Sequence, residues 1–286
     1  MTNYKIKPTL LWFWASALLV MFMLHGTARA QGVAMALDRT GDVDISVGAK
    51  TARLNVLDYL PADTEIRLTS GASATLVYLA TSQEWQFVGP GRYRLQAGQP
   101  IVVQGAAPKA RGIPAPSTQA MAKLEPTQRE RMALGAIVMR SMAPLRIVGP
   151  NNVDVFNQRP TLLWQITEKR AARVSIFSVT STTPVAQTVT SAMQWTSPAD
   201  LPPGDYTWRA EIESDTPGAG RNGRFRIIDG ADPRRARIAS MPEGFAQRVA
   251  YAVTLESEDL PHDALVLWRA LAAERPDEES LQQWAR

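Results

Sequence analysis

Short alternating segments, broken by glycine and proline, constrain the first third of this chain more than any other feature. Residues 33–104 are predicted to be all-β, because apolar and polar residues alternate with a period of two in runs such as 43–47, VDISV. This pattern is typical of a strand with one buried face. Gly48, Pro61 and the Gly-Pro-Gly run at 89–91 separate the segments. Strands this short and this often interrupted predict a β-solenoid, barrel or sandwich and argue against a βαβ fold.

The same region carries a family resemblance. The run 57–71, LDYLPADTEIRLTSG, resembles the FecR-like domain of bacterial envelope proteins, and so do the segments 74–78 and 89–95. The resemblance covers about a quarter of the chain and is one of pattern more than of unique chemistry. Ala62 stands where the family usually has Gly, and residues 80–84 replace an Asp-Gly-Ser-type turn. The second departure changes the rim expected to touch a partner.

The resemblance implies a periplasmic address and, in the members that give the family its name, signalling across the inner membrane. Those members carry a cytoplasmic sigma-factor-binding segment before a membrane helix. Only nine residues precede the apolar run of this chain, so we do not expect an anti-sigma role.

The N-terminal residues have the pattern of an export signal. Lys5 and Lys7 precede an almost entirely apolar run at 10–24, and Ala28-Arg29-Ala30 follows. Small residues at 28 and 30 form the A-x-A cleavage pattern, so residues 1–30 are predicted to be a signal peptide cleaved after Ala30. The alternative is a retained anchor, but the apolar run is shorter than the ~20 residues of a spanning helix. We therefore expect a periplasmic or secreted protein with no stable membrane span after cleavage.

The net charge and the absence of cysteine narrow the classes of partner and site that this chain can have. Lys5, Lys7 and Arg29 supply three units of the net charge of +4, which leaves +1 for residues 31–286. Because nucleic-acid binding needs a clustered basic face, we expect no nucleic-acid partner, and a polyanion is not favoured. The chain has no Cys, so neither disulfides nor thiolate sites are available.

Residues 106–143 change character. The stretch 106–117 is rich in Pro, Ala and Gly and predicts a semi-rigid linker. The stretch 127–142 predicts an imperfectly amphipathic helix, with Thr127 and Glu130 as a capping box. We expect this helix to pack beside one of the β modules, and a docking helix for a partner is the alternative.

Residues 144–229 return to strand patterns. The segments "Pro-x-Leu-x-Trp" at 160–164 and "Leu-x-Pro-Gly-x-Tyr-x-Trp" at 201–208 place Trp164 and Trp208 in apolar strands. This arrangement resembles an immunoglobulin-like or fibronectin type III-like sandwich. It lacks the Cys pair of antibody-type domains.

Residues 232–286 switch to a helical period. One helix is predicted from near Pro242, with a break at residues 259–261 and a second helix that ends near Pro276. Ala252, Ala264 and Trp268 have the small-and-large spacing that resembles one tetratricopeptide repeat. One repeat buries its faces poorly, so a third short helix with Leu281 and Trp284 is expected to cap the pair, or the pair to dock on the sandwich.

The inventory of reactive residues argues against catalysis. His262 is the only His after residue 30 and is expected at the surface near a helix N-terminus. The chain has no G-x-S-x-G motif, phosphate-binding loop or dinucleotide-binding motif. Asp42 and Asp44 lack the Gly and terminal Glu of a calcium loop. We predict no catalytic residue, no cofactor and no metal site.

Three residues are candidates for partner binding: Gln83 in the rim of the FecR-like region, and Trp85 and Trp195 in otherwise polar stretches. An exposed Trp stacks on sugars or anchors proteins, although Trp in a β module is more often a core residue.

The predicted fold class is mainly β with α. Its parts are a signal peptide (1–30), a FecR-like β domain (31–105), a linker with an amphipathic helix (106–143), an immunoglobulin-like sandwich (144–229) and tetratricopeptide-like helices (232–286). The predicted function is a non-catalytic binding or scaffold protein of the bacterial cell envelope, whose partner is an envelope protein or cell-wall polysaccharide. The alternatives are a carbohydrate-binding protein that uses exposed Trp, a periplasmic signalling component, and an enzyme with paired carboxylates.

Overall fold

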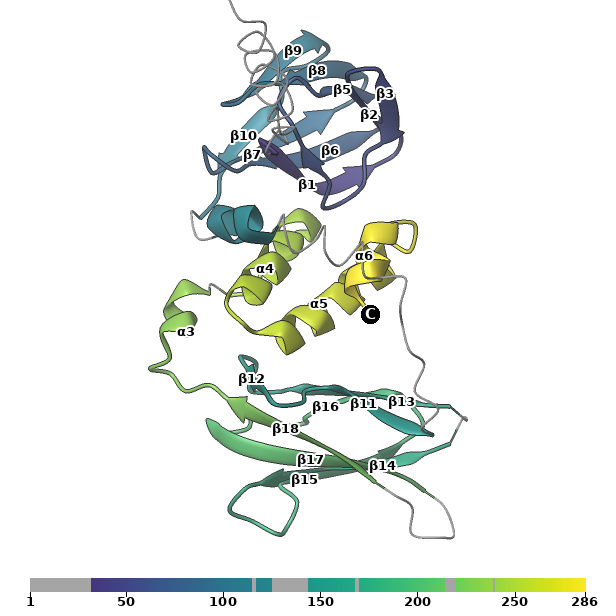
Figure 1. Cartoon of the computed structure of the whole chain (residues 1–286), viewed down its shortest axis with the longest axis vertical. Helices are drawn as coiled ribbons and strands as arrows, with labels where there is room; N and C mark the ends of the chain where they lie inside the picture. Colours follow the sequence, from purple (N-terminus) through teal and green to yellow (C-terminus); the bar gives the residue numbers. More distant parts are fainter. Residues whose placement is uncertain (1–31, 115–116, 125–143, 168–169, 214–219, 239) are drawn as a thin grey trace, which may run out of the picture. The chain divides into compact units, whose positions relative to one another are not determined.

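The computed structural model describes residues 32–114, 117–124, 144–167, 170–213, 220–238 and 240–286. Residues 32–286 form one compact unit. This unit is built mainly of strands, with helices near the C-terminus (Figure 1), which confirms the predicted mainly β class. The predicted signal peptide (1–30) and the predicted helix at 127–142 lie outside the described residues. Among the described helices, none has the length and apolar character needed to cross a membrane.

The first β domain is a sandwich of two five-stranded sheets. One sheet has the order β10-β7-β6-β1-β4, with β1 (Ala34–Thr40), β4 (Tyr59–Leu60), β6 (Ser73–Tyr78), β7 (Gln83–Val88) and β10 (Lys109–Gly112). The other has the order β3-β2-β5-β8-β9, with β2 (Val43–Val47), β3 (Lys50–Arg53), β5 (Glu65–Leu68), β8 (Gly91–Leu95) and β9 (Pro100–Gln104). Alternate residues of both sheets form one core, which includes Tyr78, Phe87 and Tyr93.

Strand β1 is buried on both of its faces. Ala34 and Ala36 belong to the core of the sandwich, whereas Met35 and Leu37 belong to a cluster formed with the C-terminal helices. A strand covered on both sides has no reason to alternate apolar with polar residues. The period-two pattern therefore begins only at β2.

The segment expected to be a linker contains ordered structure. Lys109–Gly112 form β10, whose backbone pairs antiparallel with β7, although all four side chains are exposed. Residues 117–124 are helical, and Met121 and Leu124 are buried in the cluster with the C-terminal helices. The linker prediction rested on side-chain composition. Strand pairing is made by backbone groups, which composition does not report.

The second β domain is also a two-sheet sandwich. The smaller sheet has the order β11-β13-β16 and the larger one β12-β18-β17-β14-β15. Their bounds are β11 (Leu145–Gly149), β12 (Val153–Val155), β13 (Thr161–Ile166), β14 (Ala172–Ser178), β15 (Ala186–Thr190), β16 (Gln194–Thr196), β17 (Gly204–Ile212) and β18 (Arg221–Ile227). Only β12 with β18 is a parallel pair among the described ladders. This division of strands is of the immunoglobulin-like kind.

Two aromatic features fix this sandwich. The Tyr206 hydroxyl donates to the carbonyl of Pro202 at 2.8 Å, which is the tyrosine corner of such folds. Buried Trp164 and Trp208 pack with ring centroids 6.4 Å apart, and Trp208 Nε1 donates to the carbonyl of Pro150 at 2.8 Å. Gly223 leaves room for this contact, because a Cβ there would collide with the indole nitrogen.

Four helices follow the second sandwich: α3 (Pro233–Arg237), α4 (Phe245–Ser257), α5 (Pro261–Glu274) and α6 (Glu279–Trp284). Helices α4 and α5 pack together, with Ala252 and Ala264 fully buried. Trp268 of α5 and Trp284 of α6 have ring centroids 5.5 Å apart. The helices share their hydrophobic cluster with Met35, Leu37 and Val77 of the first β domain, so the hairpin does not bury its faces alone.

Buried polar contacts join the helices to the first β domain. Arg39 of β1 and Glu278, both nearly inaccessible, form an ion pair at 2.6 Å. The other carboxylate oxygen of Glu278 accepts the backbone N–H of Val56 at 3.1 Å. A charge this deeply buried requires a partner, because its removal from water is costly.

Helix α5 joins the second sandwich differently. His262, expected at the surface, is 5% exposed, and its Nε2 donates to the carbonyl of Thr161 at 2.8 Å. Both oxygens of Asp263 accept backbone N–H groups, from Phe156 at 2.8 Å and from Asn157 at 3.0 Å. His262 is buried because the first turn of α5 lies against the sandwich. Its position at the start of a helix does not indicate this contact.

Candidate functional site

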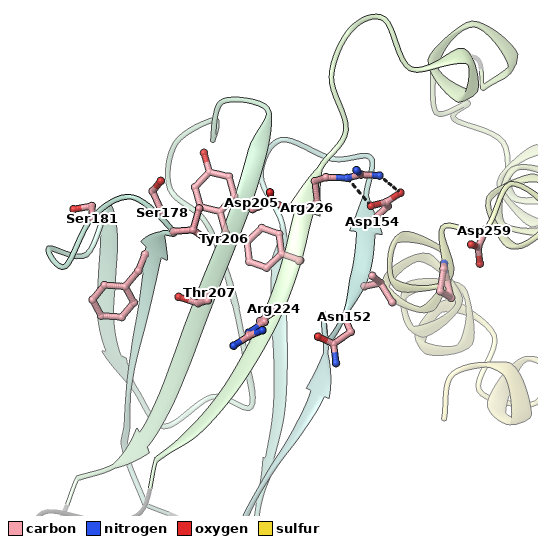
Figure 2. Close-up of a pocket in the computed structure, with 15 residues that line it drawn as sticks. Asn152, Asp154, Ser178, Ser181, Asp205, Tyr206, Thr207, Arg224, Arg226 and Asp259 are labelled. Atoms are coloured by element: carbon pink, nitrogen blue, oxygen red, sulfur yellow. Dashed lines mark hydrogen bonds and ion pairs between the residues drawn. The ribbon is translucent and has the colours of Figure 1, made fainter.

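A hollow of about 920 Å³ lies on the outer face of the larger sheet of the second sandwich. We call it the Arg224 hollow. Figure 2 draws its lining, which comes from β12, β14, β17, β18 and adjoining residues: Asn152, Val153, Asp154, Phe177, Ser178, Val179, Ser181, Asp205, Tyr206, Thr207, Arg224, Phe225, Arg226, Asp259 and Pro261. Alternate residues of β17 and β18 point into the core, so their neighbours present polar groups outward.

Strand register places one charged row across this face. Asp154 of β12 pairs with Arg226 of β18, which pairs with Asp205 of β17. Arg226 donates to both carboxylate oxygens of Asp154 at 2.9 Å, as the dashed lines in Figure 2 show. Arg234 also donates to Asp154, at 2.7 Å. Burial acts to raise the pKa of Asp154, but the hydrogen bonds from Arg226 and Arg234 outweigh it and hold the pKa below the usual value.

The next row differs because its cation, Arg224, lies opposite a threonine and not opposite an acid. Arg224 lies opposite Thr207, which lies opposite Phe177. Among the residues that the structure describes, none forms an ion pair or side-chain hydrogen bond with the exposed Arg224 guanidinium, which Figure 2 shows without a dashed line. Val179 at the edge of the hollow is 61% exposed. The hollow thus combines a guanidinium that lacks an acid with hydroxyl groups and an apolar edge.

Two polar groups of the hollow are already engaged within the chain. Asp154 accepts hydrogen bonds from Arg226 and Arg234, which hold its pKa below the usual value. Burial raises the pKa of the Tyr206 hydroxyl, which donates its hydrogen bond to the carbonyl of Pro202. Within the described ranges, no group of three His, Asp or Glu side chains is arranged to hold a metal ion. Arg224 is suited to a carboxylate or another anionic oxygen group of a partner.

The candidate Gln83 does not lie on an open rim. It is the first residue of β7, half-buried, and it pairs with Tyr78 of β6 and Gly112 of β10. The neighbouring Ser82 and Glu84 contact the chain's own helices, through Thr118 at 2.9 Å and Gln247 at 3.0 Å. The surface expected to bind a partner is therefore contacted by helical residues of the same chain.

Trp85 and Trp195 are half-buried and lie in different β domains. Trp85 packs on the core of the first domain and meets Tyr78 edge-on at 6.5 Å. Trp195 of β16 packs on the core of the second. Neither lines the Arg224 hollow, and these contacts favour the interpretation of both as core residues.

Sequence reasoning missed Arg224. The run Arg224-Phe225-Arg226 alternates in the strand pattern, which marks both arginines as outward-facing. Only the pairing of β18 with β12 shows that Asp154 lies opposite Arg226, whereas Arg224 has no acid partner among the described residues. Asp154 lies about 70 positions earlier in the chain, so no local pattern reports this difference.

Comparison with known proteins adds little. No family model matches the chain, and no curated protein matches it. The fibronectin(III)-like modules of CbhA from Clostridium thermocellum are similar in structure at a TM-score of 0.23 and 7% identity, over 76% of this chain and 86% of that one. A likeness at this level does not assign a fold, so the immunoglobulin-like assignment of the second sandwich depends on its strand order alone. The FecR and tetratricopeptide resemblances stay predictions.

Proposed function

We propose that this chain is a non-catalytic binding protein of the bacterial cell envelope. In this proposal the N-terminal segment exports the chain, and the second sandwich holds an envelope protein at the Arg224 hollow. A signalling role would use the same contact.

One observation carries the proposal: Arg224 faces outward without an acid partner in the described part of the chain, whereas Arg226 on the same strand is paired. An exposed guanidinium without an ion pair is available to an anionic group on a partner, and Arg is enriched at interfaces. Exposed Val179 adds apolar contact at the edge of the same hollow.

Photo-crosslinking in living cells tests this site. A crosslinking residue at Val179 should give one discrete envelope-protein adduct, and the additional change Arg224→Gln should remove most of it. A crosslinker at Met193, which is 45% exposed and outside the hollow, is the matched control. Equal adducts from both positions, or an adduct that persists after Arg224→Gln, would refute the proposed site.

Localisation needs its own test. Fractionation of cells that produce the tagged chain should place it outside the cytoplasm, with a mass that corresponds to loss of residues 1–30. A cytoplasmic, unprocessed chain would overturn the envelope assignment and leave the binding role of the Arg224 hollow to be judged by the crosslinks.

A further inference from the structure

A second hollow lies on the outer face of the sheet β3-β2-β5-β8-β9 in the first β domain. It has a volume of about 910 Å³ and a mainly polar lining. Along these strands Val43, Ile66 and Tyr93 are buried in the core, so the residues that alternate with them face outward. We call this surface the Arg67 face.

Strand register collects arginines on the Arg67 face. One row crosses all five strands as Arg53, Asp44, Arg67, Arg92 and Gln104, each opposite the next. Arg67 of β5 and Arg92 of β8 are therefore direct cross-strand neighbours. Side chains in such pairs lie close together, and like charges directly opposite each other are destabilising. The fold keeps two positive groups together on an open surface.

The acids of this face do not neutralise Arg67. Glu65 is engaged by Arg92 at 2.5 Å, with Arg94 at 3.9 Å from its other oxygen. Asp44 lies opposite Arg67 in the register, yet no ion pair joins them. In the described part of the chain, no residue gives the Arg67 guanidinium an ion pair or a side-chain hydrogen bond. Within the described residues, Arg67 thus has no direct ion-pair partner, and it lies between Asp44 on one side and Arg92, which Glu65 holds, on the other.

Two neighbouring guanidinium groups form a receptor for one anionic group with two oxygens. The planar fork of Arg matches a carboxylate through paired N–H···O bonds. A carboxylate between Arg67 and Arg92 would accept hydrogen bonds from Arg67 and from the N–H groups of Arg92 that Glu65 does not use.

The rest of the lining indicates what carries this carboxylate. Hydroxyl and amide groups border the hollow, from Ser46, Thr51, Thr69, Ser70 and Gln104, and such groups exchange hydrogen bonds with hydroxyls. The Asp44 and Glu65 carboxylates accept hydrogen bonds from hydroxyl groups too. The same two acids would repel the densely charged phosphates of a nucleic acid. The lining favours a molecule with few negative charges and many hydroxyls.

We propose that the Arg67 face binds an acidic carbohydrate, with a sugar carboxylate held between Arg67 and Arg92 and neighbouring hydroxyls at the polar border. This site is separate from the Arg224 hollow and uses no aromatic platform. The proposal does not depend on the partner of the second sandwich.

Calorimetric titration of the purified chain with an oligogalacturonate tests the site. We expect binding at low ionic strength, and Arg67→Gln should weaken it roughly ten- to hundredfold, because hydrogen bonds to charged groups are lost. Arg67→Lys should recover part of the affinity, since it keeps the charge but not the fork. Arg173→Gln, at an exposed arginine that lines neither hollow, is the matched control and should bind as the unmodified chain does.

Two further probes separate the sources of affinity. The methyl ester of the same oligomer, which lacks the charge, should bind as weakly as Arg67→Gln binds the acid. Inorganic phosphate at equal concentration should not displace the oligomer. Equal binding of acid and ester, no binding of the acid, or unchanged binding by Arg67→Gln would each overturn the proposal. Displacement by phosphate alone would also overturn it, because a bare anion site would then account for the binding.

Because Arg67 is exposed and forms no direct ion pair with the described residues, the Arg67→Gln variant should fold and melt as the unmodified chain does. A failed titration therefore reports on binding. A failure here leaves the Arg224 crosslinks unaffected, so the two proposals stand or fall separately.

Discussion

The outer faces of the two β domains carry similar side chains in a different order. On the second sandwich, Arg226 lies between Asp154 and Asp205, and the ion pairs Arg209–Glu211 and Arg173–Glu213 join charges of different rows. On the first domain, Arg67 lies between Asp44 and Arg92. Register decides which charges become neighbours. A face with arginines can thus be neutralised by its own acids or left with a positive group for a ligand.

The two domains also differ in how they join the helices. The first uses a buried ion pair, Arg39 with Glu278. The second uses His262, whose pKa is lowered to about 4 mainly by burial, and Asp263, whose pKa is raised to about 6 mainly by burial. The junction of the first domain therefore depends on an ion pair. The junction of the second depends on two groups whose neutral forms are favoured by burial.

The largest effect is expected from breaking the charged junction. Glu278→Gln should lower the free energy of unfolding by about 3–5 kcal/mol, because Arg39 would remain buried beside a neutral group. Asp277, whose side chain is 57% exposed, also contacts Arg39, at 3.2 Å. Asp277→Asn is the control and should cost less than about 1 kcal/mol. Urea unfolding measures both, and equal losses would contradict the assigned role of Glu278.

The junction of the second sandwich should respond to pH. The folded-state pKa of His262 lies below its usual value of 6.5, so its stability contribution is present above pH 6.5 and is lost as the pH falls toward about 4. The folded-state pKa of Asp263 lies above 3.8, so its contribution is present below pH 3.8 and is lost as the pH rises through about 6. The two slopes oppose each other between pH 4 and 6.

Single substitutions should separate these slopes. In His262→Gln only Asp263 still titrates, so stability should rise as the pH falls from 6 to 4. In Asp263→Asn only His262 still titrates, so stability should fall over the same range. Each change should be about 3 kcal/mol for a pKa shift of this size. Urea midpoints across this pH range are the measurement. Parallel curves for the two variants would show that these residues do not set the response.

The paired face of the second sandwich predicts a smaller effect. Asp154→Asn removes the shared acceptor of Arg226 and Arg234 and should cost about 1–2 kcal/mol at neutral pH. The pKa of Asp154 is lowered in the folded chain, so this stability is present above pH 3.8 and is lost as the pH falls below it. Asp205 is exposed and forms no ion pair with the residues that the structure describes. Asp205→Asn should therefore change the free energy of unfolding by less than about 0.5 kcal/mol. Thermal melting distinguishes the two.

The smallest effect is expected on the first domain. Arg67→Gln should change stability by less than about 0.5 kcal/mol, because it removes a like-charge neighbour, Arg92, and an opposite-charge neighbour, Asp44, together. Arg224→Gln, which loses no neighbour of either sign in the described structure, should leave stability unchanged. If Arg67→Gln proved clearly destabilising, the contrast between the two faces would fail, because Arg67 would then be a structural residue.

Local patterns predicted many elements of this fold. The break at residues 259–261 lies where α4 ends at Ser257 and α5 begins at Pro261. Trp164 and Trp208 occupy core positions, as the alternation in their strands indicated. Strand β1 escaped prediction because both of its faces are buried, and β10 because its exposed side chains carry no periodic signal.

The candidate sites were much less accessible to sequence reasoning. The sequence predicts a partner-binding rim at Gln83, and it does not indicate that helical residues of the chain contact its neighbours Ser82 and Glu84. His262 was placed at the surface because it begins a helix, yet that turn lies against the sandwich. In each case a distant segment of the chain decided the exposure.

By itself, the sequence determined which residues alternate, where strands and helices break, and which aromatic side chains enter the two cores. These properties follow from neighbours a few positions apart, whose periodicity separates a buried face from an exposed one. Tertiary structure alone decided that Arg67 meets Arg92, that Arg226 meets Asp154, and that Arg224 forms no ion pair with the residues that the structure describes. The reason is that electrostatic neighbours are set by strand register between segments tens of residues apart, and register is a property of the assembled sheet.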